Sequence, residues 1–505
     1  MARYKSYSHD KITKEIAFEE KILPGTIEYT INEMVEHAID TSCFATHYKN
    51  DITGAPAYDP KVLLKIVLYA YSQGIVSSRR IAKCCRDDMK CIALAGGAEP
   101  HFTTIANFIS SMGGEIEKIF RDILAVCDEL GLIGKNVFAL DGCKLPSNAS
   151  KEWSGTRADF ERKREKIAEE IARLKKRRGS AEETDKEIRE REERSLEKLA
   201  AKQKKLDDWL AEYDDKIGKR GKPIKSNVTD NESAKMKTSH GVIQGYDGVA
   251  MVDQKHQVSV YAEVFGEAQE QDLLEPMIEK TKEEFRSIGG PDNIFEQTKL
   301  LADAGFHTEE NMKKLAEEGI DAYVADNRFR QRDPRFASAQ RHKPVAAKKV
   351  GRFKPRDFIY DRNKRSCLCP AGNKLYLKNR NFVVDGRRAV CFQARSTDCR
   401  TCPLRGQCLR NENQKTSRQV YFFEETEEKN ENFTEKMIRK IDSYKGRILY
   451  GFRLGIVETV FGHIKNNLGL LRFTLRGKLK VDIQWKLFNI VHNIGKIYRY
   501  GYAAT

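Results

Sequence analysis

The chain of 505 residues lacks long apolar runs, and its mean hydropathy is only −0.62. A helix needs about 20 consecutive apolar residues to cross a bilayer, so we expect no transmembrane segment and no membrane partner. The first residues, MARYKSYSHDKITKEIAFEE, also lack the apolar core of a secretory signal, which predicts a cytoplasmic protein. Apolar residues still make up 40% of the chain, enough to form hydrophobic cores, and this excludes a disordered chain.

Acidic residues are scarce in the last third of the chain, and this scarcity accounts for the overall net charge of +16. Residues 321–505 contain 40 basic and 17 acidic residues, a net charge of +23, whereas the preceding residues carry a net charge of −7. Lys and Arg displace the counterions that condense on phosphates, so this block favours nucleic acid as the partner. A solubilising surface or contact with an anionic membrane is the alternative interpretation.

The twelve cysteines divide into two groups of six. The first six are scattered in apolar helical stretches and are typical of small buried side chains, whereas the other six lie within residues 367–408. Without an export signal, this second group predicts a metal site rather than disulfides, with a loop of free thiols as the alternative. A structural Zn²⁺ takes four thiolates, and the spacing offers four of them: Cys369, Cys399, Cys402 and Cys408.

Residues 1–130 show helical spacing of apolar residues with short turns, which predicts a helical, helix-turn-helix-like domain that binds DNA. Asp59 and Pro60 are typical of a helix start. Ser78 is the expected N-cap of the next helix, with Arg79 and Arg80 in its first turn as candidate DNA contacts. Thr103, Thr104 and Asn107, near a later helix start, would also suit a helix that contacts DNA, or alternatively they are only caps and surface polar residues.

From residue 136 the pattern changes to strand, helical insert, strands, helix, strand, helix and strand. This order predicts an α/β domain with a mixed sheet over residues 136–505. The first insert, residues 156–217, is predicted to be an antiparallel helical hairpin or, alternatively, one long dimerising coiled coil. The second insert, residues 328–432, is basic and contains the cysteine cluster.

Three carboxylates occupy positions from which they could hold metal ions. Asp141 and Asp303 each end an apolar strand run, and Glu458 lies on an amphipathic helix with Lys465 two turns further on. Carboxylate oxygens are preferred by Mg²⁺, and two such ions can clamp the attacking and leaving oxygens of a phosphodiester. Taken singly, each residue is explained more simply as a turn, a cap or a solvated helix residue.

Taken together and in this order, the motifs resemble the bacterial insertion-sequence transposases of the DDE superfamily, whose catalytic domain has the ribonuclease H-like fold. The resemblance covers most of the chain. It rests on these segments: YDPKVLLKIVLYAYSQGIVSSRRIAKCCRDDMKCIALAGG, FALDGCKLPSNAS, SNVTDNESAKMKTSHGVIQGYDGVAMVDQKHQVSVYAEV, LADAGFHTEENMKKLAEEGIDAYVADN and FRLGIVETVFGHIKNNLGLLRFTLRGKLKV.

The resemblance implies that Asp141, Asp303 and Glu458 are the catalytic triad and bind two Mg²⁺ ions. It further implies phosphate contacts from Arg453 and Lys465, and it favours the same four cysteines as Zn²⁺ ligands. Arg472 and Arg476 are further candidate phosphate contacts or, alternatively, part of a basic surface. Related transposases have three residues between the Arg and the Glu, whereas four separate Arg453 from Glu458 here. On a continuous α-helix that spacing turns the two side chains about 140° apart. We therefore expect Arg453 to reach the site only if the helix starts near Gly455.

The function implied by the resemblance is that of a Mg²⁺-dependent endonuclease that binds transposon ends, cleaves them and transfers the 3′-hydroxyl to target DNA. Pairing two ends requires at least a homodimer in the active state, and the implied location is the bacterial cytoplasm, in association with the nucleoid. The alternatives are a catalytically silent, domesticated DNA-binding protein and another ribonuclease H-like nuclease. The complete set of Asp, Asp and Glu argues against the first, and the helical N-terminal region with the cysteine insert against the second.

Overall fold

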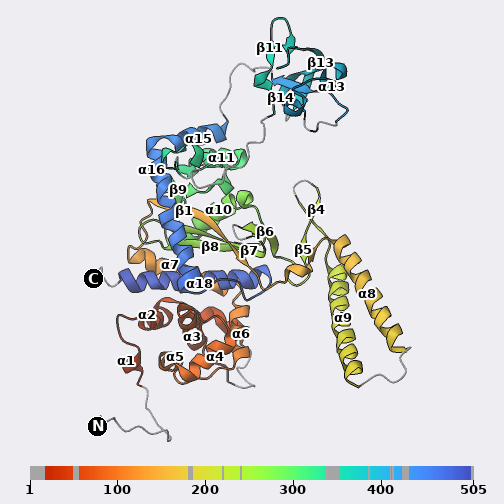
Figure 1. Cartoon of the computed structure of the whole chain (residues 1–505). Coiled ribbons are helices and arrows are strands. Elements are labelled where there is room, and N and C mark those ends of the chain that lie inside the picture. Colours follow the sequence, from red (N-terminus) through yellow and green to blue (C-terminus); the bar gives the residue numbers. More distant parts are fainter. Residues whose placement is uncertain are drawn as a thin grey trace, which may run out of the picture. The chain divides into compact units, whose positions relative to one another are not determined.

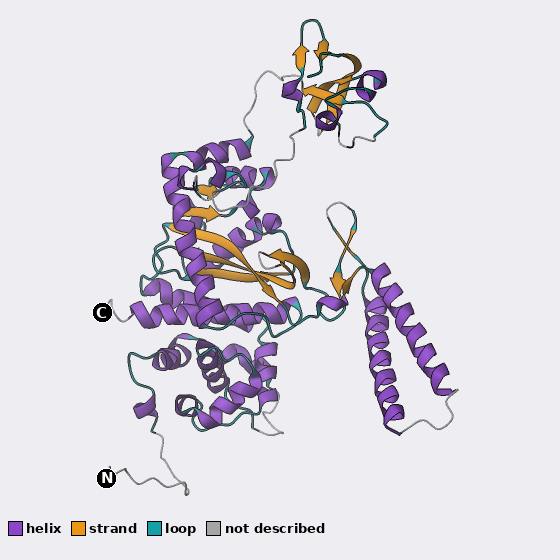
Figure 2. Ribbon diagram, viewed as in Figure 1, coloured by secondary structure: helices purple, strands orange, loops and turns teal. Residues whose placement is uncertain are grey.

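A computed structural model describes residues 17–48, 56–179, 186–218, 221–238, 241–336, 338, 352–384, 387–409, 411, 414–423 and 432–501. The chain forms two compact units (Figures 1 and 2). We call residues 1–332 with 433–505 the main unit, and residues 333–432 the inserted unit. None of the helices in the described ranges combines the length and the apolar character that a membrane span requires.

The main unit is built on a mixed sheet with β1 at its centre (Figure 1). β1 pairs antiparallel with β7 on one side and parallel with β9 on the other, and β8 and β10 extend the sheet outward. The fold class predicted from the sequence is therefore confirmed, and it is consistent with a ribonuclease H-like fold. The strands are β1 (Val137–Pro146), β6 (Ala234–Thr238), β7 (Gly241–Asp253), β8 (Ser259–Phe265), β9 (Lys299–Ala302) and β10 (Ala322–Val324).

Helix α18 (Lys478–Tyr500) packs on this sheet through a fully buried tryptophan. The indole Nε1 of Trp485 donates a hydrogen bond to the Val249 carbonyl at 3.1 Å. Gly248 makes room for the ring, because a Cβ there would lie only 3.0 Å from it. Further along, the Asn493 amide bonds both the N–H and the carbonyl of Ser259 at 2.9 Å, so the helix covers part of the outer edge of β8.

The N-terminal helices share one hydrophobic core with the sheet and α18, as the packing of Tyr71 against Phe488 illustrates, with ring centroids 5.0 Å apart. The helix predicted at Pro60 begins there, and Asp59 caps it by accepting from the Lys61 N–H at 2.8 Å. The expectation for Ser78 is wrong, because Ser77 is the N-cap of the next helix. The helices are α1 (Phe18–Lys21), α2 (Ile27–Glu33), α3 (Pro60–Ser72), α4 (Ser78–Asp87), α5 (Met89–Leu94), α6 (Phe102–Ser111) and α7 (Glu115–Glu129). The domain boundary predicted near residue 130 stays a prediction.

The first insert has two helices, α8 (Arg157–Gly179) and α9 (Lys186–Glu212), which run antiparallel as a hairpin (Figure 1). Ion pairs join them at both ends, between Arg164 and Asp207 and between Arg177 and Glu192. The apolar residues in and just after α9 are only partly buried. Leu206 and Leu210 are buried, but Tyr213 is exposed, and Trp209 completes the small core at the hairpin root, which comprises Phe160, Leu206, Trp209 and Leu210.

The inserted unit has its own antiparallel sheet and a small core around Phe392. Its strands run in the order β11–β12–β13–β14–β15, which is also their order in the chain. They are β11 (Ile359–Asp361), β12 (Ser366–Leu368), β13 (Lys374–Val384), β14 (Arg387–Gln393) and β15 (Gln419–Phe423), and the helices α13 (Ser396–Arg400) and α14 (Arg405–Cys408) lie between β14 and β15.

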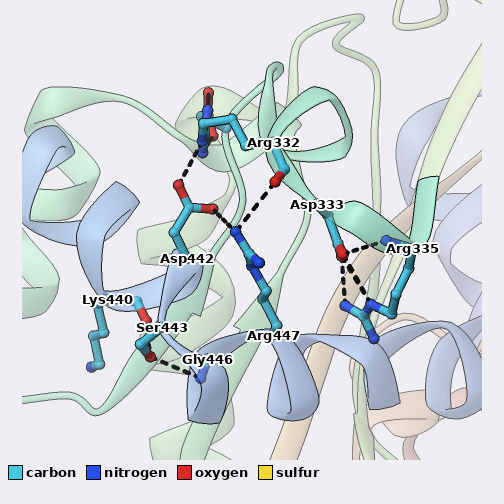
Figure 3. Close-up of polar contacts among 9 residues, drawn as sticks. Arg332, Asp333, Arg335, Lys440, Asp442, Ser443, Gly446 and Arg447 are labelled. Atoms are coloured by element: carbon cyan, nitrogen blue, oxygen red, sulfur yellow. Dashed lines mark hydrogen bonds and ion pairs between the residues drawn. The ribbon is translucent and has the colours of Figure 1, made fainter. Parts of the chain in front are cut away.

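Ion pairs and hydrogen bonds within the main unit join the segment that precedes the inserted unit to the segment that follows it. The guanidinium of Arg332, at the end of α12 (Phe329–Arg332), donates to Asp442, at the end of α15 (Phe433–Asp442), at 2.5 Å. Arg447 on α16 (Tyr444–Arg453) donates to the Arg332 carbonyl at 3.3 Å and lies 3.9 Å from the Asp442 carboxylate (Figure 3). An insertion at this point therefore leaves the central sheet intact.

The burial of Trp485 predicts a large loss of stability on truncation. Trp485→Ala should destabilise the main unit by about 3–5 kcal/mol, because it removes a buried ring and leaves a cavity against Gly248. Leu479→Ala is the matched control, since Leu479 is 63% exposed on the same helix and its truncation should cost less than about 0.5 kcal/mol. Thermal unfolding of the full chain measures both, and equal losses would contradict the packing described here.

Candidate active site

Asp141, on β1, and Asp303, directly after the parallel strand β9, lie beside each other. Asp303 follows the last residue of β9, as predicted, whereas Asp141 lies in the middle of β1 and not at its end. β1 continues to Pro146 because it stays paired with β7, but its pairing with β9 stops at Leu140 and Ala302. The end of β9 therefore leaves one edge of β1 open at Asp141, next to Asp303.

The Asp141 carboxylate is largely buried and forms an ion pair with Arg453, whose side chain is only 6% exposed. Burial, together with the charge of Asp303, raises the pKa of Asp141 to about 6, against the opposing effect of Arg453. Asp303 accepts a hydrogen bond from the Gly305 N–H at 2.5 Å, which orients its carboxylate at the start of the turn Ala304–Phe306.

Arg453 reaches Asp141 from a helix that does not start near Gly455, so that expectation is wrong. The helix runs from α16 through a π turn, Leu454–Glu458, into α17 (Thr459–Gly462) and then a second π turn, His463–Asn467. A π turn closes hydrogen bonds from residue i to i+5 and so accommodates one additional residue within a helix. The π turn therefore accommodates the fourth residue between Arg453 and Glu458 without interrupting the helix. The additional residue was the only sequence signal for the π turn.

Glu458 is exposed at the end of the first π turn, and this turn packs on β1 and β7. Burial raises the pKa of the Cys143 thiol to about 11, and the charge of Lys465, in the second π turn, opposes this increase, so Lys465 lies near Cys143. Cys143 lies two residues after Asp141 and therefore on the same face of β1. The helix thus carries Glu458 and Lys465 over the face of β1 that bears Asp141.

The two arginines predicted after this helix lie beside the end of β1. Arg472 donates to the Ser147 carbonyl at 3.2 Å, and Arg476 donates to the Asn148 carbonyl at 2.7 Å, and both side chains remain exposed. In the N-terminal helices, Arg79 and Arg80 are also exposed, with the Arg79 guanidinium 4.7 Å from the centre of the Phe102 ring. A role of these residues in DNA binding stays a prediction.

A charged cluster on the opposite face of β1 was missed in the sequence. Lys144 lies opposite Asp247 of β7, and its ammonium contacts Glu270 at 2.5 Å and Asp247 at 3.9 Å. Asp247 is fully buried, and neither of its carboxylate oxygens has a hydrogen-bond partner in the described residues. Burial, with the charge of Glu270, raises the pKa of Asp247 to about 8. The only sequence signal was a polar residue in an otherwise apolar strand.

In the inserted unit, the four predicted cysteines line one small pocket. Cys369 follows β12, Cys399 lies in α13, Cys402 follows it, and Cys408 ends α14. Burial raises the pKa of Cys408, and the charges of the other three cysteines raise it further, while Arg418 opposes them. Cys367 and Cys391 do not line this pocket and are buried in the sheet.

Neither group forms a complete coordination shell in this structure. Within the ranges that the structure describes, no three His, Cys, Asp or Glu side chains lie close enough together to hold a metal ion. Of the three predicted Mg²⁺ ligands, Asp141 and Asp303 are neighbours, whereas Glu458 lies on the helix that packs over β1. The assignment of these residues, and of the cysteines, as metal ligands therefore stays a prediction.

Comparison with known families gives two matches, one in each half of the chain. Residues 16–111 match a family described as a transposase domain (DUF772), and residues 368–498 match a transposase DDE domain. The first match covers most of the N-terminal helices, and the second covers much of the inserted unit, the helix with Arg453 and Glu458, and most of α18. No curated protein matches the chain significantly. The two matches support the resemblance to insertion-sequence DDE transposases that the sequence motifs indicated.

The buried pair of Asp141 and Arg453 predicts a strong coupling between the two residues. Arg453→Met should destabilise the protein by about 3–5 kcal/mol, because it leaves the Asp141 carboxylate buried without its cation. In the double variant with Asp141→Asn this charge is absent, so the double variant should be more stable than the sum of the single effects by at least about 1 kcal/mol. Denaturant unfolding of the four proteins measures the coupling, and strictly additive losses would contradict it.

Proposed function

We propose that the protein binds the ends of its insertion sequence, cleaves the DNA by Mg²⁺-dependent hydrolysis and transfers the freed 3′-hydroxyl to target DNA. The observation that carries this proposal is the pair of carboxylates, Asp141 and Asp303, at the open edge of β1. The helix with Glu458 packs over the same strand, and a transposase DDE domain match includes that helix. The paired ends would be held by a homodimer.

The residues of this site fit Mg²⁺ in their chemistry. Asp141, Asp303 and Glu458 would hold the ions, since all three supply the carboxylate oxygens that Mg²⁺ prefers. When bound, two ions would stabilise the attacking and leaving oxygens of the phosphodiester. Arg453 holds the Asp141 carboxylate in a buried position, so the ligand is oriented before any ion arrives.

The same side of the main unit offers positive charge to the DNA backbone. Lys465, Arg472 and Arg476 follow Glu458 in the chain and lie along the face and the end of β1. Cations placed there would neutralise phosphates next to the carboxylates, which would otherwise repel them. The basic inserted unit would add further contacts, because residues 333–432 carry 23 basic and 11 acidic residues.

The proposed chemistry predicts that each carboxylate is required for cleavage but not for DNA binding. Asp141→Asn, Asp303→Asn and Glu458→Gln should each abolish Mg²⁺-dependent nicking of a labelled end fragment, because each removes a metal ligand. Binding of the same fragment in a gel-shift assay should change less than about threefold. Asp321→Asn removes a half-buried carboxylate before β10 that pairs with Lys440, and this matched control should cleave normally. Retained nicking by Asp141→Asn would refute the assignment.

We also propose that the inserted unit binds a structural Zn²⁺ through Cys369, Cys399, Cys402 and Cys408. Four thiols line one pocket there, and the described core of this unit is small, so a metal would supply folding energy that the core does not. No histidine lines the pocket, so the donor set would be four thiolates.

The zinc proposal is tested by metal analysis of the purified protein. The wild-type chain should contain one Zn²⁺ per chain, and Cys402→Ser should lose it, because only three thiolates remain. Cys391→Ser is the matched control, since Cys391 is buried in the same unit but outside the pocket, and it should retain the ion. Loss of zinc in both variants, or absence of zinc from the wild-type protein, would contradict the proposed ligand set.

A further inference from the structure

The turn that carries Asp303 is packed against a carboxylate from another segment. Glu270 begins the turn Glu270–Asp272, between β8 and α10 (Leu274–Ser287). A Cβ on Gly305 would lie only 2.0 Å from the Glu270 Oε2, so this oxygen rests directly on the Gly305 backbone. The N–H of Gly305 in turn donates to the Asp303 Oδ1. The Gly305 backbone therefore lies between the two carboxylates and is in contact with both.

A second contact joins the same two turns. Asn311, in the first turn of α11 (Glu309–Glu317), donates one hydrogen bond to the Gln271 carbonyl at 2.8 Å and another to the Phe306 carbonyl at 2.9 Å. The segment with Glu270 is therefore attached to the segment with Asp303 at two independent places. A displacement of the first turn would move the second.

The other oxygen of Glu270 is held by the strand that carries Asp141. The Lys144 ammonium lies 2.5 Å from the Glu270 Oε1, and Lys144 is on β1, three residues after Asp141. Asp247 lies below this pair, fully buried and 3.9 Å from the ammonium. Glu270 thus spans from β1 to the Asp303 turn, with one oxygen on each.

We propose that Glu270 is a positioning residue that fixes the Asp303 carboxylate relative to Asp141, with Lys144 as its tether. The inference rests on the proposed function, because it concerns a metal ion shared by these two aspartates. An ion shared by two side chains from different segments binds more tightly when their separation is fixed before binding, because less conformational entropy is then lost. A partner that orients a metal ligand without contacting the metal typically contributes 10–100-fold to metal affinity.

The test is Mn²⁺ binding to the full-length protein without DNA, measured by calorimetry. Glu270→Gln and Lys144→Met should each weaken Mn²⁺ binding about tenfold or more, because each breaks the connection between β1 and the Asp303 turn. Glu275→Gln is the matched control, since Glu275 pairs with Lys314 on the helices and should bind Mn²⁺ normally. Thermal midpoints within a few degrees of the wild type show that the weakened binding is not general unfolding.

A pair of variants tests the contact itself. Gly305→Ala should weaken Mn²⁺ binding, because the new methyl group meets the Glu270 carboxylate. Adding Glu270→Ala removes that clash, so the double variant should unfold at a higher temperature than Gly305→Ala alone. No difference between these two proteins would overturn the contact.

Asp303→Asn distinguishes a failure of the positioning role of Glu270 from a failure of the proposed metal site. If this variant loses Mn²⁺ binding while Glu270→Gln and Lys144→Met bind normally, the positioning role is overturned and the proposed metal site stands. If Asp303→Asn binds Mn²⁺ as the wild type does, the metal site of the proposed function is itself overturned, and the positioning role with it.

Discussion

The ion pair between Asp141 and Arg453 joins the two elements on which the candidate site depends. One partner lies in the middle of the central strand, and the other on a helix more than 300 residues later in the chain. Both are largely buried, so the cost of removing them from water is offset only while they remain paired. The pair therefore fixes how the helix lies over the strand. It also determines where Glu458, five residues further along that helix, is presented.

The two faces of β1 contact different sets of charged residues. On the face with Asp141 and Cys143 lie the helix and its cations, and on the face with Gly142 and Lys144 lies the buried cluster around Asp247 and Glu270. The first face includes the edge of β1 that is unpaired from Asp141 onward, where β9 ends, whereas the second is packed and holds the neighbouring turn. β1 stays paired with β7 but loses its pairing with β9 after Leu140. It can therefore carry the candidate site on one face while its other face remains packed against the neighbouring turn.

Much of the fold was predictable because its signals are local. Apolar runs and amphipathic helices follow each other in the chain as the strands and helices do in the structure, and Asp303 lies where its apolar run ends. Asp141 was misplaced within its strand because the length of β1 depends on pairing with β7, which no local pattern encodes. The four cysteines that line the pocket were predicted from their spacing together with the family resemblance.

Other features of the site depend on distant partners. Glu270 reaches Lys144 across 126 positions of sequence, so neither residue signals the contact. The π turn before Glu458 was misjudged because the additional residue was weighed against an ideal α-helix, whereas the buried partner of Arg453 stabilises a wider turn. In both cases tertiary packing decided a geometry that the local sequence left open.

The central claim is that Asp141 and Asp303 share a divalent metal ion at the open edge of β1. Anomalous diffraction from crystals of the full chain grown with Mn²⁺ tests it most directly. The account predicts an anomalous peak in contact with carboxylate oxygens of both aspartates. Mn²⁺ bound only elsewhere, with Asp141 still paired to Arg453 alone, would contradict it.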